Sequence, residues 1–148
     1  MGHLNLKTLL NSKEKYKGFV LRHSRLVESK NGQRIEVQVI PRANSKGICS
    51  VCSSVGPTYD HLSEREFIHV PIWGIIVIFL YCMRRIDCEK CGVKVEKVPW
   101  ADGKSPLTIS MMWYLSEWAK LLSWKSVATK MKVSWHHIFA SVSFVVDW

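Results

Sequence analysis

Two cysteine pairs, Cys49-Ser-Val-Cys52 and Cys88-Glu-Lys-Cys91, are the stretches of this 148-residue sequence that decide its fold. Each Cys-x-x-Cys pair can direct two thiolates at one point in space. Two such pairs supply the tetrahedral four-sulfur set that Zn²⁺ takes at about 2.3 Å per bond. This set leaves no position open for substrate, so we predict a structural zinc ion in a zinc ribbon. The 35 residues between the pairs exceed the usual compact spacing, but a ribbon tolerates a long insert between its two hairpins.

Other interpretations of the cysteines stay open at this point. Four thiols in this pattern also suit an iron centre for electron transfer, a redox dithiol or unligated core cysteines. His61 or His69 is an alternative ligand, and Cys82 lies in an apolar run where we expect it to be buried. Gly92 directly follows the second pair and suits a tight turn with positive φ, whereas Ser53 holds the equivalent place after the first pair.

The charge of the chain indicates what kind of partner it has. There are 21 Lys and Arg against 12 Asp and Glu, a net charge of +9, which favours polyanions such as nucleic acid or anionic membranes. The excess is uneven: +7 over residues 1–48, −1 over 49–103 and +3 over 104–148. Because 47% of the residues are hydrophobic, the charge must coexist with packed cores, and a mainly disordered chain is excluded.

Neither the first twelve residues nor the longest apolar run predicts a membrane location. The longest apolar run, Val70–Met83, is shorter than the roughly 20 residues that a membrane-spanning helix needs. Residues 1–12 show no continuous apolar segment of a secretory signal. We therefore expect no membrane partner and a reducing cytoplasm, where cysteines bind metal more often than they form disulfides.

Periodicity predicts a helix and then strands in the first two thirds of the chain. Residues 34–40 alternate strictly and follow an Asn31-Gly32 turn signal, so we predict a hairpin with the strand that begins at Phe19. A short strand over 65–70 and a Trp73-Gly74 turn follow. The part of the apolar run after this turn has β-branched and aromatic residues on both faces, which predicts a central strand covered on both sides, with a buried helix as the alternative. The apolar positions of an N-terminal amphipathic helix are Leu4, Leu6, Leu9 and Leu10.

The last third changes to helical periodicity. Thr108, Ser123 and Ser134 are candidate N-caps of three helices, the last two running to Met131 and Val146. The expected fold class is therefore α+β in three modules: a basic helix and β-hairpin over 1–47, a zinc ribbon over 48–103, and a three-helix helix-turn-helix unit over 104–148.

The helix-turn-helix interpretation depends on the second and third of these helices. Ala128 suits a close helix crossing, and Val133 and Ile138 face inward. Lys132 stands where Gly is common, so we expect the turn to take another form. A helical hairpin for dimerisation is the alternative, and core packing is the alternative for Trp135. The candidate contacts to the phosphates and bases of double-stranded DNA are Lys125, Lys130, Lys132, Ser134, Trp135, His136, His137 and Ser141.

A series of short motifs, in order along nearly the whole chain, resembles the N-terminal half of bacterial insertion-sequence transposases of the ISL-three family. The motifs are Pro41-Arg-Ala-Asn-Ser45, Gly-Pro-x-Tyr-Asp60, Val-Pro-Ile-Trp-Gly74, Met-Arg-Arg-Ile-Asp-Cys88, Cys-Gly-Val-Lys-Val-Glu96, Val-Pro-Trp-Ala101 and Leu-Ser-Trp-Lys-Ser-Val-Ala128 followed by Ser-Trp135.

The resemblance implies a zinc ribbon and a helix-turn-helix that bind the terminal inverted repeats of a mobile element, with the chain at the bacterial nucleoid. It also implies a separate catalytic domain with three carboxylates and two metal ions, which we expect to be absent here. No catalytic residue and no enzymatic activity are therefore expected of this chain alone. There are two alternative roles. The chain is a dimerisation fragment that pairs with itself as a homodimer or with a full-length transposase, which it then inhibits, or it is a zinc-ribbon transcription regulator.

Overall fold

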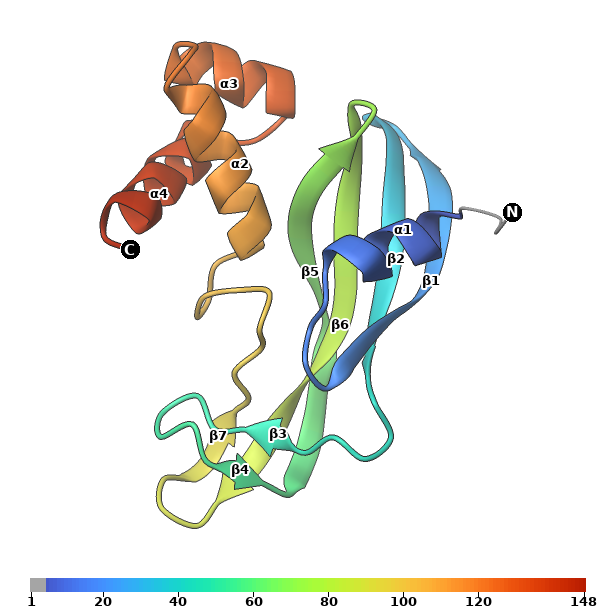
Figure 1. Cartoon of the computed structure of the whole chain (residues 1–148), viewed down its shortest axis with the longest axis vertical. Helices are drawn as coiled ribbons and strands as arrows, with labels where there is room; N and C mark the ends of the chain where they lie inside the picture. Colours follow the sequence, from blue (N-terminus) through green and yellow to red (C-terminus); the bar gives the residue numbers. More distant parts are fainter. Residues whose placement is uncertain (1–4) are drawn as a thin grey trace.

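The computed structural model describes residues 5–148 and has an α+β fold, which confirms the α+β part of the predicted fold class. A mixed sheet carries one helix on its face, and three further helices follow beside it (Figure 1). The helices are α1 (Leu6–Lys13), α2 (Ile109–Ala119), α3 (Trp124–Met131) and α4 (Trp135–Val146). The strands are β1 (Phe19–Ser29), β2 (Gly32–Pro41), β3 (Gly47–Ile48), β4 (Val55–Gly56), β5 (Thr58–Ile72), β6 (Ile75–Cys88) and β7 (Gly92–Val95).

The main sheet has five strands in the order β1-β2-β6-β5, with β7 also paired to β6. The β2–β6 pairing is parallel and the others are antiparallel. Strands from the first two predicted modules, 1–47 and 48–103, thus lie in one sheet, while the three-domain division stays a prediction. The N-terminal helix prediction holds for α1, where Leu10 is buried; Leu4 lies outside the described residues.

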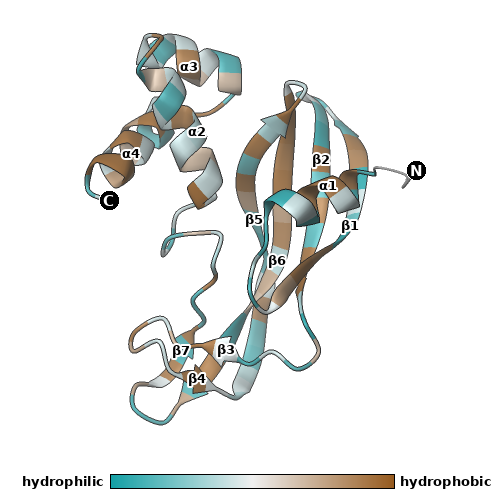
Figure 2. Ribbon diagram, in the orientation of Figure 1, coloured by the Kyte–Doolittle hydropathy of each residue, from teal (hydrophilic) through white to brown (hydrophobic). Residues whose placement is uncertain are grey.

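The apolar run after Trp73-Gly74 is the central strand β6, as predicted, and the alternative of a buried helix is wrong. Figure 2 shows hydrophobic residues along much of this strand. Its two faces differ in burial, because Val77, Phe79 and Tyr81 face the core whereas Cys82, on the opposite face, is exposed. The expectation that Cys82 is buried is therefore wrong.

β5 is longer than the predicted strand over 65–70. It begins at Thr58, and its pairing with β6 contains three irregularities, one of them between Thr58 and Asp60. Asp60 forms an ion pair with Arg85 of β6. Cross-strand pairing stabilises this polar half of β5, which lacks the apolar alternation on which a strand prediction depends.

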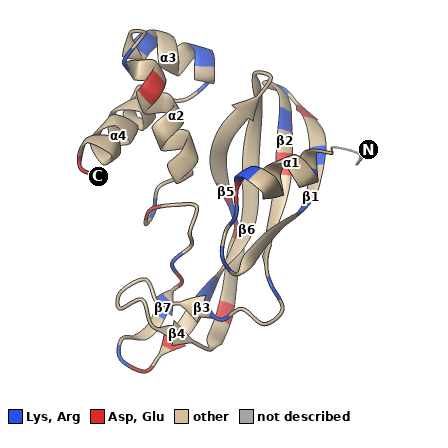
Figure 3. Cartoon of the chain, viewed as in Figure 1, with Lys and Arg blue, Asp and Glu red and all other residues tan. Residues whose placement is uncertain are grey.

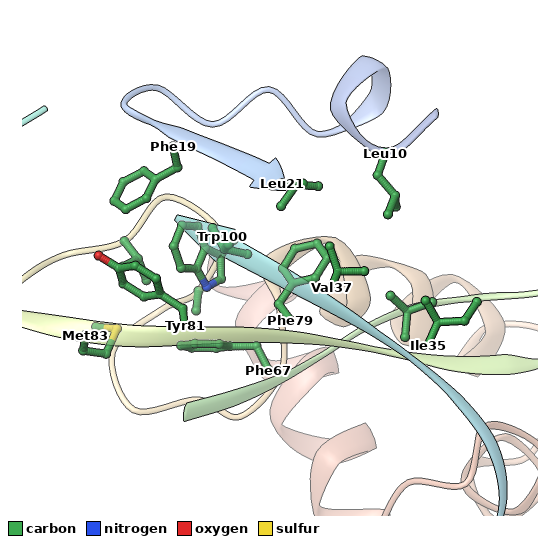
Figure 4. Packing of buried hydrophobic residues seen from close by; sticks show 14 residues of the cluster. Leu10, Phe19, Leu21, Ile35, Val37, Phe67, Phe79, Tyr81, Met83 and Trp100 are labelled. Carbon is green, nitrogen blue, oxygen red and sulfur yellow. The ribbon is translucent and has the colours of Figure 1, made fainter. Parts of the chain in front are cut away.

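Trp100 is the centre of the larger hydrophobic core (Figure 4). Its ring is 1% exposed, and its centroid lies 4.9 Å from that of Phe19 and 5.8 Å from that of Phe67, both edge to face. Tyr16 and Tyr81 complete the aromatic contacts at 5.6 and 5.1 Å. Since Trp100 follows β7, these contacts fix the path of the chain from the sheet to α2.

The three C-terminal helices begin where the capping signals predict. The side chains of Thr108, Ser123 and Ser134 accept hydrogen bonds from backbone N–H groups three residues later, at the starts of α2, α3 and α4. The helices pack around a second core, whose buried members are Leu107, Met111, Met112, Leu115, Val127 and Ile138.

The helices join the sheet through a buried polar contact at the start of α2. His69 of β5 is 4% exposed, and its Nδ1 lies 2.9 Å from the Thr108 hydroxyl oxygen, while its Nε2 lies 3.4 Å from Glu14 Oε1. Glu14 also accepts a hydrogen bond from the Ser110 hydroxyl of α2 at 3.0 Å. Burial lowers the pKa of His69 from 6.5 to about 4, against an opposing effect of Glu14, so the imidazole is neutral at pH 7.

This junction predicts a specific pH dependence of stability. The pKa of His69 is about 4 in the folded chain and 6.5 in the unfolded chain. Between these pH values the unfolded chain binds a proton that the folded chain does not bind, so the free energy of unfolding falls by about 3 kcal/mol as the pH decreases from 6.5 to 4. The variant His69→Asn keeps a polar atom for Thr108 but has no titrating imidazole. Its free energy of unfolding, measured by urea denaturation, should lack this decrease between pH 6.5 and 4. His61→Asn, at an exposed position of the same strand, should retain it; equal pH slopes in His69→Asn and the unsubstituted chain would contradict the assignment.

Candidate metal centre and nucleic-acid interface

The four predicted cysteine ligands meet in space. Cys49 and Cys52 lie in the turn between β3 and β4, and Cys88 and Cys91 lie at the turn between β6 and β7. Their Sγ atoms all lie within 4.8 Å of one another, and those of Cys52 and Cys88 are 3.4 Å apart. Sulfurs bound tetrahedrally to one zinc ion would be separated by about 3.8 Å. The donor set therefore fits a single metal ion with four thiolate ligands.

The backbone at each cysteine pair explains how the sulfurs converge. The Cys49 N–H donates to the Ser54 carbonyl at 2.8 Å, and the Ser53 N–H donates to the Cys49 carbonyl at 3.0 Å, which closes the first turn. Ser53 and Gly92, which follow the two pairs, have φ of 60° and 77°. The predicted positive φ at Gly92 is confirmed, and Ser53 adopts the same backbone region with a side chain.

Two glycines let the β3–β4 hairpin approach β6 closely. A Cβ atom at Gly47 would lie 2.1 Å from Cδ1 of Ile86, and one at Gly56 would lie 2.6 Å from its Cγ2. Ile86 is fully buried under the hairpin. The absence of side chains at these glycines therefore brings the first cysteine pair within reach of the second, which follows Ile86 on β6.

A buried ion pair links this cluster to the aromatic core. The Glu96 side chain is fully buried; it accepts from the Arg84 Nε at 3.0 Å and from the Tyr81 hydroxyl. Burial, followed by the hydrogen bond to Glu96, raises the pKa of Tyr81. Glu96 also forms a β-bridge with Cys49. Because removal of one partner would leave a buried charge, this network holds the metal end of the sheet in register with the Trp100 core.

The thiols have unequal acidities in the absence of an ion. Hydrogen bonds from Ser54 lower the pKa of Cys52 from 9 to about 6, and the hydrogen bond with Cys52 raises the pKa of Cys91 from 9 to about 12. Cys52 is therefore the more acidic of the two shifted thiols. A cation then favours release of the thiol protons, because thiolates are the ligands that metals bind.

The alternative ligands do not join the cluster. His69 contacts Thr108, and His61 is exposed on β5, in the antiparallel register opposite Arg84. Cys82 lies outside the group of four sulfurs.

The second candidate site is formed by α3, α4 and the turn between them. Lys132 ends α3 with φ 56° and ψ 40°, and the next residue, Val133, donates to the Ala128 carbonyl at 3.1 Å. The turn thus adopts the left-handed geometry that usually favours Gly, although a Lys stands there. The expectation of a different turn is therefore wrong, since helix-end hydrogen bonds offset the strain.

Most candidate DNA contacts lie on the outer side of this unit. The exposed ones are Lys125, Lys130, Lys132, Ser134, Trp135 and His136. His137 is half-buried, and burial together with His136 lowers its pKa. Ser141 is completely buried, and its hydroxyl donates to the His137 carbonyl at 2.6 Å. Ser141 therefore has no exposed side chain in this structure, and its contact to DNA stays a prediction.

Sequence reasoning missed an aromatic cluster on the same surface. The rings of Trp135 and Phe139 are stacked, with centroids 5.7 Å apart and planes 15° apart, and each residue is 51% exposed. Trp124 of α3 packs against Trp135 at 5.7 Å. The four-residue spacing of the two aromatics on α4 is the sequence signal that identifies this face.

Comparison of the chain with protein-family models, with curated proteins and with solved structures found no match.

Along residues 5–148, none of the helices has the length and apolarity needed to cross a bilayer. Figure 3 shows basic residues on α3 and in the turn after it.

The metal centre predicts a sharp contrast between two kinds of cysteine. Cys49→Ser or Cys88→Ser should lower bound metal from one ion per chain toward none and lower the midpoint of urea denaturation, because metal-binding free energy is also folding free energy. Cys82→Ser, at an exposed thiol outside the cluster, should change neither quantity. The measurements are elemental analysis by mass spectrometry and near-UV circular dichroism. Full metal content and an unchanged spectrum in Cys88→Ser would contradict the assignment.

Proposed function

We propose that this chain is a DNA-binding module. In this proposal the four cysteines hold a structural zinc ion in a zinc ribbon, and α3 and α4 form a helix-turn-helix whose second helix, α4, enters the major groove. Following the motif resemblance, the DNA is the terminal repeat of an insertion sequence. The proposal gives the chain a binding role alone and assigns no reaction to it.

The observation that carries the proposal is the exposed N-terminal end of α4 beside a group of lysines. Trp135 and His136 are exposed in the first turn of α4, and Lys130 and Lys132 are exposed just before it. Lysines there suit phosphate oxygens, and polar and apolar side chains on the first turn suit base edges and thymine methyl groups. The N-terminal end of a helix also carries partial positive charge, which favours a phosphate nearby.

A second candidate function rests on the aromatic cluster. Trp124, Trp135 and Phe139 present apolar area that a protein partner, such as a second copy of the chain or a full-length transposase, would cover. Light scattering distinguishes this candidate, because a stable dimer that ignores DNA would favour it. A coloured protein with visible thiolate-to-iron absorbance would instead favour the electron-transfer alternative.

The experiment that tests DNA binding starts without a known target. Duplexes with a randomised centre are selected on the purified, zinc-loaded chain, and the enriched duplex is compared with a shuffled duplex in gel-shift titrations at several salt concentrations. We expect tighter binding to the enriched duplex and a strong decrease of affinity with salt. No enrichment, or equal affinity for both duplexes at fixed salt, would contradict the proposal.

Lys132 allows folding and binding to be separated in one variant. Lys132→Gly should raise the free energy of unfolding by about 1 kcal/mol, since Gly adopts the left-handed turn without strain. It should also lower the slope of log affinity against log salt by about one, because one phosphate contact is lost. Lys104→Gln, at an exposed lysine between the sheet and α2, is the matched control and should leave both unchanged. A more stable Lys132→Gly variant with an unchanged salt slope would exclude this lysine from the interface.

A further inference from the structure

Two hairpin tips lie side by side at the end of the sheet that is remote from the cysteines (Figure 1). The parallel register pairs Arg34 of β2 with Ile76 of β6. Two residues earlier in the chain stand Gly32, the first residue of β2, and Gly74, in the β5–β6 turn just before β6. Because neighbouring strands are about 4.8 Å apart, the two turns are direct neighbours.

The turn between α3 and α4 reaches the same place. The Lys132 Nζ lies 3.8 Å from the position that a Cβ atom at Gly32 would take. Residues far apart in the sequence thus form one continuous surface, which we call the tip surface. Its exposed members are Lys30, Asn31, Trp73 and Lys132.

Trp73 is the most unusual residue of this surface. It is 95% exposed, the highest value among the exposed large hydrophobic residues, and it adopts φ 50° before Gly74 at φ 74°. A two-residue turn with positive φ at both positions favours Asn-Gly, and a bulky side chain there is strained. Neither burial nor turn geometry therefore accounts for a Trp at this position.

Backbone strain of this kind occurs at the cysteine cluster and on the tip surface. The described non-glycine residues with positive φ are Ser53, in the first cysteine turn, and Trp73 and Lys132, both on the tip surface. A strained residue persists where the surrounding structure holds it, and such residues cluster at functional sites.

The charge of the tip surface complements a polyanion. Along the described chain, no carboxylate lies within ion-pair distance of Lys30, Lys130 or Lys132. The nearest acidic group on β1, Glu28, is exposed and accepts a hydrogen bond from the Gln33 side chain at 2.7 Å. Glu36 of β2 and Glu66 of β5 are paired with Arg34, farther from the tip. The tip surface therefore presents two ammonium groups outside any ion pair around an exposed indole, with one carboxylate at its β1 side.

We propose that the tip surface is a second DNA contact, in which Trp73 packs against bases in the groove adjoining the one that α4 occupies. Lys30 and Lys132 bind the phosphates between the two grooves. An apolar wedge flanked by basic groups is a recurrent way for a protein to engage a base step without reading its sequence. This inference rests on the proposed DNA-binding function and adds a site to it.

The test uses a substitution that relieves strain. Trp73→Asn should unfold at the same or a higher urea concentration than the unsubstituted chain, since Asn tolerates positive φ. Its affinity for the selected duplex should fall by about tenfold, the effect of losing one aromatic–base contact. Trp148→Asn, which changes a 78% exposed Trp at the far end of α4, is the matched control and should bind as the unsubstituted chain does.

Two readouts keep this inference separate from the proposed function. In hydroxyl-radical footprinting, Trp73→Asn should lose protection at one edge of the site and retain it where α4 binds, whereas Trp73→Phe should restore it. Equal affinities and footprints for Trp73→Asn and Trp148→Asn would overturn the inference while leaving DNA binding intact. Loss of a dimer in light scattering with unchanged DNA affinity would also overturn it, because Trp73 would then contact a second copy. Absence of any selected duplex would overturn both.

Discussion

The pairing of β6 with β2, β5 and β7 is the constraint on which the rest of the structure depends. The strand is apolar where it crosses the Trp100 core and polar where it approaches Cys88, so one backbone connects the core, the cysteine cluster and the Trp73-Gly74 turn. Because a one-residue slip would turn every side chain to the opposite face, the buried Val77, Phe79 and Tyr81 fix the register. The cysteine cluster and the Trp73-Gly74 turn therefore take their positions from this one strand, whereas the helices dock on the neighbouring strand β5.

The two ends of β6 are stabilised in different ways. At the cysteine end, little apolar area is available, and the buried Arg84–Glu96 pair and the four thiols replace it. A metal ion suits such an end, because its binding energy substitutes for a hydrophobic core in a small module. At the other end the turns are exposed, and the C-terminal helices contact the sheet at two places. Thr108 contacts His69 of β5, and Lys132 lies near Gly32 of β2. The chain thus joins an end where four thiols could hold a metal ion to an end that we propose as a DNA contact.

The predictions that succeeded depend on short-range physical effects. The side chains of Thr108, Ser123 and Ser134 each cap a helix whose first N–H groups lack partners, and this requirement is visible over four residues of sequence. The predictions that Cys82 is buried and that the strand covers only 65–70 are wrong, because burial and strand length depend on partners distant in the sequence. Cys82 lies on an exposed face of β6, and the polar start of β5 is paired with β6.

By itself, the sequence determined the α+β class, the cysteine pairs, the central strand and the three capped helices, because turn chemistry, periodicity and spacing act locally. Only the tertiary structure decided that the four sulfurs lie within 4.8 Å, that Trp135 and Phe139 stack on an exposed face, and that Lys132 lies near Gly32. The reason is physical: these proximities follow from the parallel β2–β6 register and from the docking of α2 on β5, and neither contact leaves a periodic signal along the chain.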